Sequence, residues 1–308
     1  MKKTNLPKRV YFPPDPGKSK GRWLKYGFDL LGVPTFQTAT LAGETEESRI
    51  YPIELEFENK IVRIWFDIAA SRTWKRLELL ETVPDSLYFK VHMAKIDRKK
   101  DPRFFPFPQS VSSMQFVGLR ESCLEQRMKQ KFKYDVVACF VNSDDGLRQK
   151  VVERLLEMTD LRVLSFMIEH PKLERPKVPD AIIRPKLRYG VHLKSQARAK
   201  ISLALPGAWR KGGASISFRH VEIWGIGGVV ASIRPGTLMT GKPGKCWIEF
   251  KKDLSDFEKQ IRYYVKNNEA REDLARRGAK YYRENHAPEK HALYLTKRVR
   301  DFFGADEL

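Results

Sequence analysis

Apolar positions follow two rhythms along this chain of 308 residues. Short runs rich in β-branched and aromatic residues are typical of strands, whereas apolar residues three or four positions apart are typical of helices. The helical pattern is clearest in Arg22–Leu31, Thr73–Leu80, Leu147–Met158, Ser217–Ile226, Leu254–Asn267, Glu269–Glu284 and Glu289–Phe303. Strands that alternate with helices predict an α/β protein with parallel, crossover-connected sheets.

The predicted strands are of different kinds. Tyr51–Phe57 and Ile61–Ile68 are separated by three polar residues, which indicates a hairpin. Tyr134–Phe140 is a continuous apolar run, as expected of a strand covered on both faces. Further strands are expected at Lys8–Phe12, Leu87–Met93, Leu161–Met167, Ile201–Leu205, Val229–Ser232 and Trp247–Phe250.

A proline-broken aromatic segment, Asp101–Pro108, interrupts the pattern and reads as a linker. It predicts two α/β lobes, residues 1–112 and 113–288.

Charge narrows the classes of partner. Lys and Arg number 58 against 38 Asp and Glu, which gives a net charge of +20. Residues 1–25 and 171–213 hold most of this excess. Such a charge favours polyanions, namely nucleic acid, an anionic membrane surface or phosphorylated substrates, although solvated surface is the alternative for either stretch.

Other chemistry is sparse. Cys123, Cys139 and Cys246 fit neither a disulfide framework nor a metal-ligand spacing. No apolar run follows the first lysines, and no stretch of about 18 apolar residues occurs. We therefore expect a cytoplasmic protein, with peripheral association at the inner face of the membrane left open.

The densest functional signal lies in Ile201–Gly228, where a strand leads through a glycine-rich, basic loop into a helix. Glycines let a backbone approach a ligand closely, and free amides at a helix start attract anions. An ordinary crossover loop is the alternative, and the Rossmann and P-loop glycine motifs are absent. The candidate anion-binding residues of the loop are Gly207, Arg210, Lys211, Gly212 and Gly213.

The helix that follows carries Arg219 and Glu222, three positions apart and so on one face. One could meet phosphate and the other hydroxyl groups, or the two could form a simple ion pair on an exposed helix. His220 lies between them and is expected to line a cleft.

These segments resemble the nucleotide-sugar-binding half of GT-B glycosyltransferases, in particular the CgeB-like spore-maturation, exostosin-like and CAP10-like (protein O-glucosyltransferase-type) families. The resemblance covers about the last 170 residues and is weak over the first 110. Its motifs are LPG at 205–207, SFRHVE at 217–222, GIGGVVAS at 225–232, DLSDFEKQIRYYV from Asp253, REDLARRGAKYY from Arg271 and, earlier, YFK at 88–90.

The resemblance implies two Rossmann-like lobes that face each other across a cleft. The first lobe would take the acceptor and the second the donor, with the last helix, 289–308, packed back onto the first. Arg219 would contact the donor diphosphate, Glu222 the ribose or sugar side, and Ser217 the phosphates. The paired-glutamate motif of many retaining enzymes is not visible, because Val230 stands at its second position. No Asp-x-Asp metal motif ends a strand, so we expect no metal and no cofactor.

An inverting transfer needs a general base for the acceptor hydroxyl. Asp67 is the first candidate, because it follows the apolar strand IVRIWF, although a helix N-cap is the alternative role. His92 is the second candidate.

The sequence thus predicts a metal-independent glycosyltransferase with a nucleotide-sugar donor and a saccharide or glycoconjugate acceptor. The basic stretches suggest an acidic acceptor or one displayed on an anionic membrane. We expect no nucleic-acid partner, and two alternatives stay open: a basic nucleic-acid-binding protein, and a degenerate, non-catalytic relative of the transferases.

Overall fold

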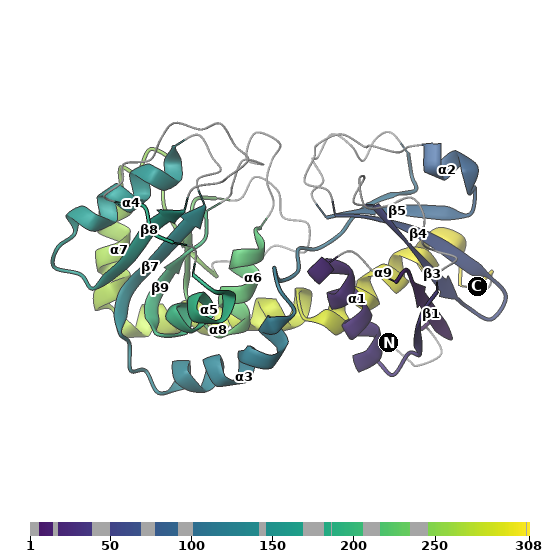
Figure 1. Cartoon of the computed structure of the whole chain (residues 1–308), viewed down its shortest axis with the longest axis horizontal. Coiled ribbons are helices and arrows are strands. Elements are labelled where there is room, and N and C mark those ends of the chain that lie inside the picture. Colours follow the sequence, from purple (N-terminus) through teal and green to yellow (C-terminus); the bar gives the residue numbers. More distant parts are fainter. Residues whose placement is uncertain are drawn as a thin grey trace. The chain divides into compact units, whose positions relative to one another are not determined.

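The chain is an α/β protein, as expected, and divides into two compact units (Figure 1). Unit 1 comprises Met1–Met114 with Glu284–Leu308, and unit 2 comprises Gln115–Arg283. The computed structural model describes residues 6–14, 18–38, 50–68, 78–91, 101–141, 146–168, 182–185, 187–205, 216–234, 246–305 and 307–308. The roles expected of the two lobes stay predictions.

Unit 1 is built on a six-stranded mixed sheet in the order β2-β1-β3-β4-β5-β6. The predicted hairpin is confirmed, since β3 and β4 pair antiparallel, and β3 is also antiparallel to β1. Parallel pairing in this sheet joins β1 to β2 and joins β4, β5 and β6 to one another, because a short turn reverses the chain between β3 and β4. The elements are β1 (Arg9–Phe12), α1 (Lys18–Leu30), β2 (Thr35–Gln37), β3 (Ile50–Glu56), β4 (Ile61–Asp67), α2 (Glu78–Thr82), β5 (Ser86–Lys90), β6 (Phe104–Pro106) and α9 (Pro288–Phe303).

The predicted linker is partly a strand, which corrects the sequence analysis. Phe104–Pro106 forms β6 at the edge of the sheet, where a proline interrupts no second ladder of hydrogen bonds. The last helix, α9, packs against α1 within unit 1. Their contact is close, because a Cβ at Gly27 would lie 2.6 Å from the carbonyl carbon of Pro288.

Unit 2 holds a five-stranded sheet in the order β11-β10-β9-β7-β8, and every pairing in it is parallel. Here the expected crossover-connected sheet is confirmed. The elements are α3 (Gln115–Met128), β7 (Tyr134–Val141), α4 (Leu147–Glu157), β8 (Val163–Ile168), α5 (Tyr189–Ala197), β9 (Ala199–Leu203), α6 (Phe218–Gly225), β10 (Val230–Ser232), β11 (Ile248–Glu249), α7 (Phe257–Lys266) and α8 (Asn268–Asn285).

Both faces of the unit 2 sheet are covered, which explains the continuous apolar run of β7. Val136 and Ala138 point into a cluster that also contains residues of α4, α7 and α8, whereas Val137 and Cys139 point to the opposite face. Successive side chains of a strand alternate between faces. In Figure 1, α4 and α7 lie on one side of this sheet and α6 on the other.

Glycines allow α6 to approach α3 and α8 closely. A Cβ at Gly278 of α8 would lie 2.9 Å from Nε1 of the buried Trp224, and one at Gly225 would lie 2.5 Å from Cζ of Phe116. Gly227 then turns the chain with φ +71°, a backbone conformation that other residues rarely adopt. The small-residue turn after α6 is therefore a packing requirement.

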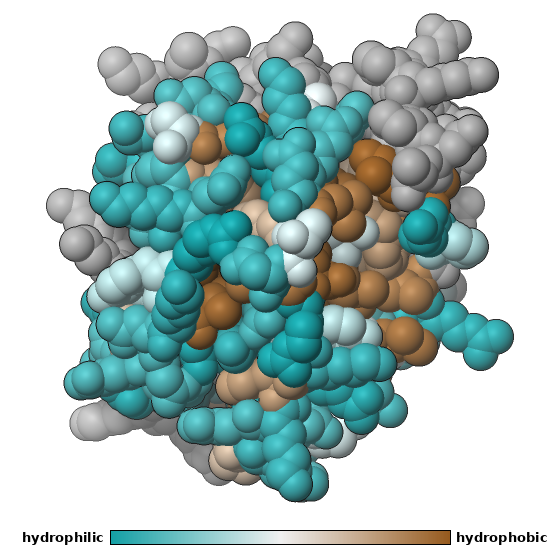
Figure 2. Space-filling view, turned by 90° about the vertical axis from the view of Figure 1, so that its left-hand side faces the viewer, coloured by the Kyte–Doolittle hydropathy of each residue, from teal (hydrophilic) through white to brown (hydrophobic). Residues whose placement is uncertain are grey.

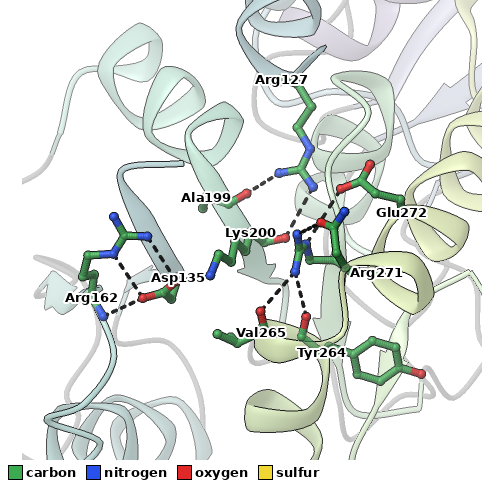
Figure 3. A network of polar contacts seen from close by, with 10 residues as sticks. Arg127, Asp135, Arg162, Ala199, Lys200, Tyr264, Val265, Arg271 and Glu272 are labelled. Carbon is green, nitrogen blue, oxygen red and sulfur yellow. Dashed lines mark hydrogen bonds and ion pairs between the residues drawn. The ribbon is translucent and has the colours of Figure 1, made fainter. Parts of the chain in front are cut away.

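Buried charges lie at the amino edge of the unit 2 sheet, where β7 and β9 begin (Figure 3). Arg127 of α3 donates to the carbonyl oxygens of Ala199, Lys200 and Gly227. Burial lowers the pKa of Arg127 to about 10, which still leaves it charged at neutral pH. Because its guanidinium donates to three backbone carbonyl oxygens, Arg127 ties α3 to strand β9 and to the turn after α6.

Asp135 is the anion of this edge. Its carboxylate accepts hydrogen bonds from Arg162 and ion-pairs with Nζ of Lys200 at 2.8 Å. Burial alone would raise the pKa of Asp135, but these partners hold it at about 2. Asp135 therefore stabilises the fold at any pH above about 4.

The Gly278 contact gives a first prediction. Gly278→Ala should lower the free energy of unfolding by about 1–3 kcal/mol, because the added methyl group overlaps the Trp224 ring. Gly118→Ala is the matched control, since that exposed helical glycine has nothing within 4 Å of its Cβ position. The control should be neutral or up to about 1 kcal/mol more stable. Urea denaturation measures both, and equal effects would contradict the packing argument.

A histidine pair is buried in unit 1 near its last helix. His286 and His291 have ring centroids 6.1 Å apart and are at most 1% exposed. Nδ1 of His286 lies 2.9 Å from the carbonyl oxygen of Gln109, whereas neither ring nitrogen of His291 has a hydrogen-bond partner within the described residues. Burial lowers the pKa of His286 to about 4, and burial and then His286 lower that of His291 well below its usual value.

The pair predicts a loss of stability in acid. Both groups take up protons more readily in the unfolded chain, so stability is full above about pH 7 and falls as the pH drops through 6.5 toward 4. The loss from His286 should reach the order of 3 kcal/mol at pH 4. His291→Phe should keep the edge contact with Phe107 and flatten this dependence. Urea denaturation between pH 7 and 4.5 tests it, and identical slopes for both proteins would refute the prediction.

Candidate functional site

The unit 2 sheet has a topological switch point between β7 and β9. From β7 the chain passes through α4 to β8 on one side, while from β9 it passes through α6 to β10 on the other. In open parallel sheets, ligands bind at the carboxyl ends of strands where such connections diverge. The α6 motif follows β9, so the predicted site lies at this edge of the sheet.

Arg219 and Glu222 do form an ion pair, but the two side chains differ in exposure. Nη1 of Arg219 lies 3.5 Å from Oε2 of Glu222, whose side chain is fully buried, while that of Arg219 is 24% exposed. The expected alternative of a pair on an exposed helix face is therefore wrong for Glu222. The arrangement leaves Arg219 as the member of the pair that reaches solvent.

Two residues of α5, Tyr189 and His192, contact this ion pair, and the four residues together form the Arg219 group. The hydroxyl of Tyr189 donates to Oε1 of Glu222 at 3.0 Å, and Nη1 of Arg219 lies 2.6 Å from Nδ1 of His192. Because Arg219 can only donate, Nδ1 of His192 accepts and the ring proton sits on Nε2. Burial and then the charge of Arg219 lower the pKa of His192 well below its usual value, which keeps the ring neutral.

The positive charge of Arg219 acts on Cys139, in the carboxyl-terminal half of β7. Burial raises the pKa of the Cys139 thiol to about 12, and the guanidinium of Arg219 acts against that rise. A thiol with so high a pKa is no nucleophile at neutral pH. The side chain that offers chemistry here is Arg219, a fixed cation beside the switch point.

Ser217 and His220 cap the start of α6. The N–H of Ser217 donates to Nδ1 of His220 at 3.3 Å, and the hydroxyl of Ser217 lies 2.9 Å from the same nitrogen. His220 is 1% exposed and packs against Trp224, and its expected place along a cleft stays a prediction. A side chain at the third helical position reaches back to the N-cap, which draws the ring inward.

Asp67 ends strand β4, as predicted, but its carboxylate does not face open surface. It accepts hydrogen bonds from the hydroxyl of Tyr88 at 2.7 Å and from Nζ of Lys90 at 2.6 Å, and both charged groups are fully buried. Asp67 and Lys90 are cross-strand partners in the ladder of β4 and β5. A buried carboxylate held by a cation is poorly placed to accept a proton from an acceptor, so its expected role as base needs correction to a structural one.

The remaining candidates, His92 and the loop residues Gly207, Arg210, Lys211, Gly212 and Gly213, lie outside the described residues.

Sequence reasoning missed Tyr189 and His192. The usable signal was the separation of the two residues by three positions, which puts them on one face of a helix directly before β9.

Within the described residues, no group of three or more His, Cys, Asp or Glu side chains is arranged to hold a metal ion. No described helix is both long and apolar enough to cross a membrane.

Residues 148–297 match the family model described as glycosyl transferase-like. The resemblance to glycosyltransferases is thereby confirmed for this segment. It contains α6, α5 and the Arg219 group, and it supports glycosyl transfer as the general activity. No functionally curated protein matches the sequence.

Two solved structures share parts of the architecture. One is the N-terminal domain of trehalose-6-phosphate phosphatase from Candida albicans, with 11% identity, a TM-score of 0.48 and coverage of 72% of this chain and 66% of that one. The other is a GtfA/B complex, with 11% identity, a TM-score of 0.35 and coverage of 81% and 65%. The chain spans somewhat less than two thirds of each structure, and neither similarity is close enough to carry over an activity.

The Arg219 group predicts that Glu222 is an internal anchor. Glu222→Ala should lower the free energy of unfolding by about 2–3 kcal/mol, because it removes the acceptor of the Tyr189 hydroxyl and the counter-charge of a partly buried guanidinium. Glu222→Gln should cost less, since its amide oxygen still accepts from Tyr189. Chemical denaturation of both variants gives the comparison, and wild-type stability for Glu222→Ala would show that the carboxylate is not an anchor.

Proposed function

We propose that this chain transfers a sugar from a nucleotide-sugar donor to a saccharide or glycoconjugate acceptor. The donor diphosphate would lie at the carboxyl edge of the unit 2 sheet, at the start of α6. The observation that carries the proposal is the fixed, partly exposed guanidinium of Arg219 beside the β7–β9 switch point, within the segment that matches the glycosyl transferase-like family.

The geometry supports a phosphate contact in particular. Within the described residues, the polar contacts of Arg219 are those of Nη1 with Glu222 and His192, which leaves the rest of the fork to the proposed ligand. Guanidinium groups bind phosphate oxygens through strong, charge-assisted hydrogen bonds. As the bond to the sugar breaks, negative charge grows on the diphosphate, and a fixed cation stabilises it.

The proposal assigns Glu222 to positioning Arg219, in place of the direct ribose contact that the resemblance implies. It keeps metal independence, because a cation and helix-start amides can neutralise the leaving group without a divalent ion. His92 remains the candidate base from the sequence. An acidic acceptor, or one on an anionic membrane, also remains part of the proposal.

Arg219→Ala should weaken the binding of a nucleoside diphosphate by about 10–100-fold, the value of one charge-assisted hydrogen bond in a cleft. Arg219→Lys should fall in between, since it keeps the charge and loses the fork. Calorimetric titration with uridine, guanosine and adenosine diphosphates measures this, and melting curves without ligand check the fold. Each titration is repeated with EDTA, which should leave the affinity unchanged.

Arg154→Ala is the matched control, because Arg154 is an exposed arginine of α4 that ion-pairs with Glu258. Its variant should bind like the wild type. Equal affinity of Arg219→Ala and wild type would overturn the proposed donor site, and a need for manganese would overturn metal independence. Binding of oligonucleotides without binding of any nucleoside diphosphate would favour the nucleic-acid alternative.

A further inference from the structure

An open depression of about 940 Å³ lies on unit 2, over the second half of α7 and the start of α8. Three cations, three amides and one aromatic ring line it, and this lining of described residues contains no carboxylate. The lining residues are Lys259, Gln260, Arg262, Tyr263, Lys266, Asn267 and Asn268.

The position of these side chains follows from the amphipathic pattern of α7. Phe257, Ile261 and Val265 are buried in the unit 2 core, so the opposite face of the helix is exposed. Tyr263 is 52% exposed, and its hydroxyl accepts a hydrogen bond from Nδ2 of Asn267 at 3.2 Å. The side of the molecule that carries α4 and α7, turned to the viewer in Figure 2, is mostly hydrophilic.

This surface is distinct from the candidate donor site. Arg262 ion-pairs with Asp160, which lies just before β8 begins, at the amino edge of the sheet. Arg271 binds the carbonyl oxygens of Tyr264 and Val265 from the same edge. Arg219 belongs to the carboxyl edge, so the two sites face different ends of the parallel strands.

The depression keeps a positive charge after its internal contacts are counted. Asp160 ion-pairs with Arg262 and its charge also reaches Lys266, whereas no described carboxylate forms an ion pair with Lys259 or Lys266. The carbonyl oxygens at the end of α7 are also occupied, because Arg271 and the N–H of Asn267 bind those of residues 263–265. The negative end of the helix therefore does not cancel the lysines.

We infer that the depression is a secondary binding site for an acidic saccharide chain, such as an extended part of the acceptor. Amide side chains offer both donors and acceptors, which suits the hydroxyl groups of a sugar. An exposed tyrosine ring covers the apolar face of a sugar ring, and the lysines bind carboxylate or phosphate substituents. The choice of a saccharide over another polyanion rests on the proposed function.

The test uses the full chain and three probes: polygalacturonate, neutral dextran of similar length, and a single-stranded oligonucleotide. Biolayer interferometry at low and high salt measures binding. The wild type should bind polygalacturonate, less so at high salt, and should bind dextran at least tenfold more weakly.

Two variants address the lining. Lys259→Gln with Lys266→Gln should weaken polygalacturonate binding about tenfold and reduce its salt dependence. Tyr263→Ala should also weaken binding, whereas Tyr263→Phe should keep most of it. The matched control is Lys129→Gln with Lys131→Gln, which removes two exposed lysines of the same unit outside the depression and should change binding little.

Four results would overturn the inference: no binding of polygalacturonate, equal binding of dextran, binding that the Lys259 and Lys266 changes leave intact, or tight binding of the oligonucleotide alone. The nucleoside diphosphate titrations are run on the same variants. Absence of saccharide binding together with normal diphosphate binding would refute only the secondary site. Normal saccharide binding without any diphosphate binding would refute only the proposed function.

Discussion

The close packing of α6 against α3 and α8 is the constraint on which the candidate site depends. Gly278 and Gly225 let the helix approach its neighbours to distances that any side chain at those positions would prevent. Arginines of α3 then bind the carbonyl oxygens at its end, with Arg120 on Gly225 and Arg127 on Gly227. Because the carboxyl end of α6 is fixed in this way, its first turn presents Arg219 at a defined place beside β7 and β9.

The two edges of the unit 2 sheet use charge for different purposes. At the amino edge, Arg127 and Arg271 are almost wholly buried and bind backbone carbonyls, while Asp135 is neutralised by Arg162 and Lys200. The protein supplies most of the hydrogen bonds of these groups, so they stabilise the fold and leave little for a ligand. At the carboxyl edge, the described residues hold Arg219 through Nη1 alone, which is the arrangement a binding site requires.

The sequence predicted most helices and strands because their apolar periodicity is strong, as in the continuous run of β7 and the last three helices. Helix α3 was missed, since only Phe116, Cys123 and Arg127 of it are buried and no apolar stripe marks it. Its attachment relies on arginines that bind carbonyls, and a pattern of apolar residues cannot show such bonds. Edge strand β6 was read as a linker because its proline signals a break, although an edge strand tolerates one.

The site was predictable to a similar degree, and for related reasons. The spacing of Arg219 and Glu222 placed them on one face of a helix, but only tertiary contacts decide which of the two is buried. Tyr189 and His192 lie on another helix, so their part in holding the pair follows from packing and not from local sequence. Asp67 illustrates the converse: its place at a strand end was read correctly, and its cross-strand partner Lys90 removed it from the surface.

The cations behind the net charge of +20 therefore serve different purposes, some in stability and others in binding. Buried cations such as Lys90, Arg127 and Arg271 contribute to stability, and their contacts within the protein already use much of their bonding capacity. Exposed lysines that form no ion pair with a described carboxylate, such as Lys259 and Lys266, act on solvent and on anything negatively charged that approaches. Cations that reach solvent, Arg219 among them, are the ones that bear on partners, so the arrangement of exposed cations on α7 is stronger evidence for an anionic ligand than the total charge of the chain.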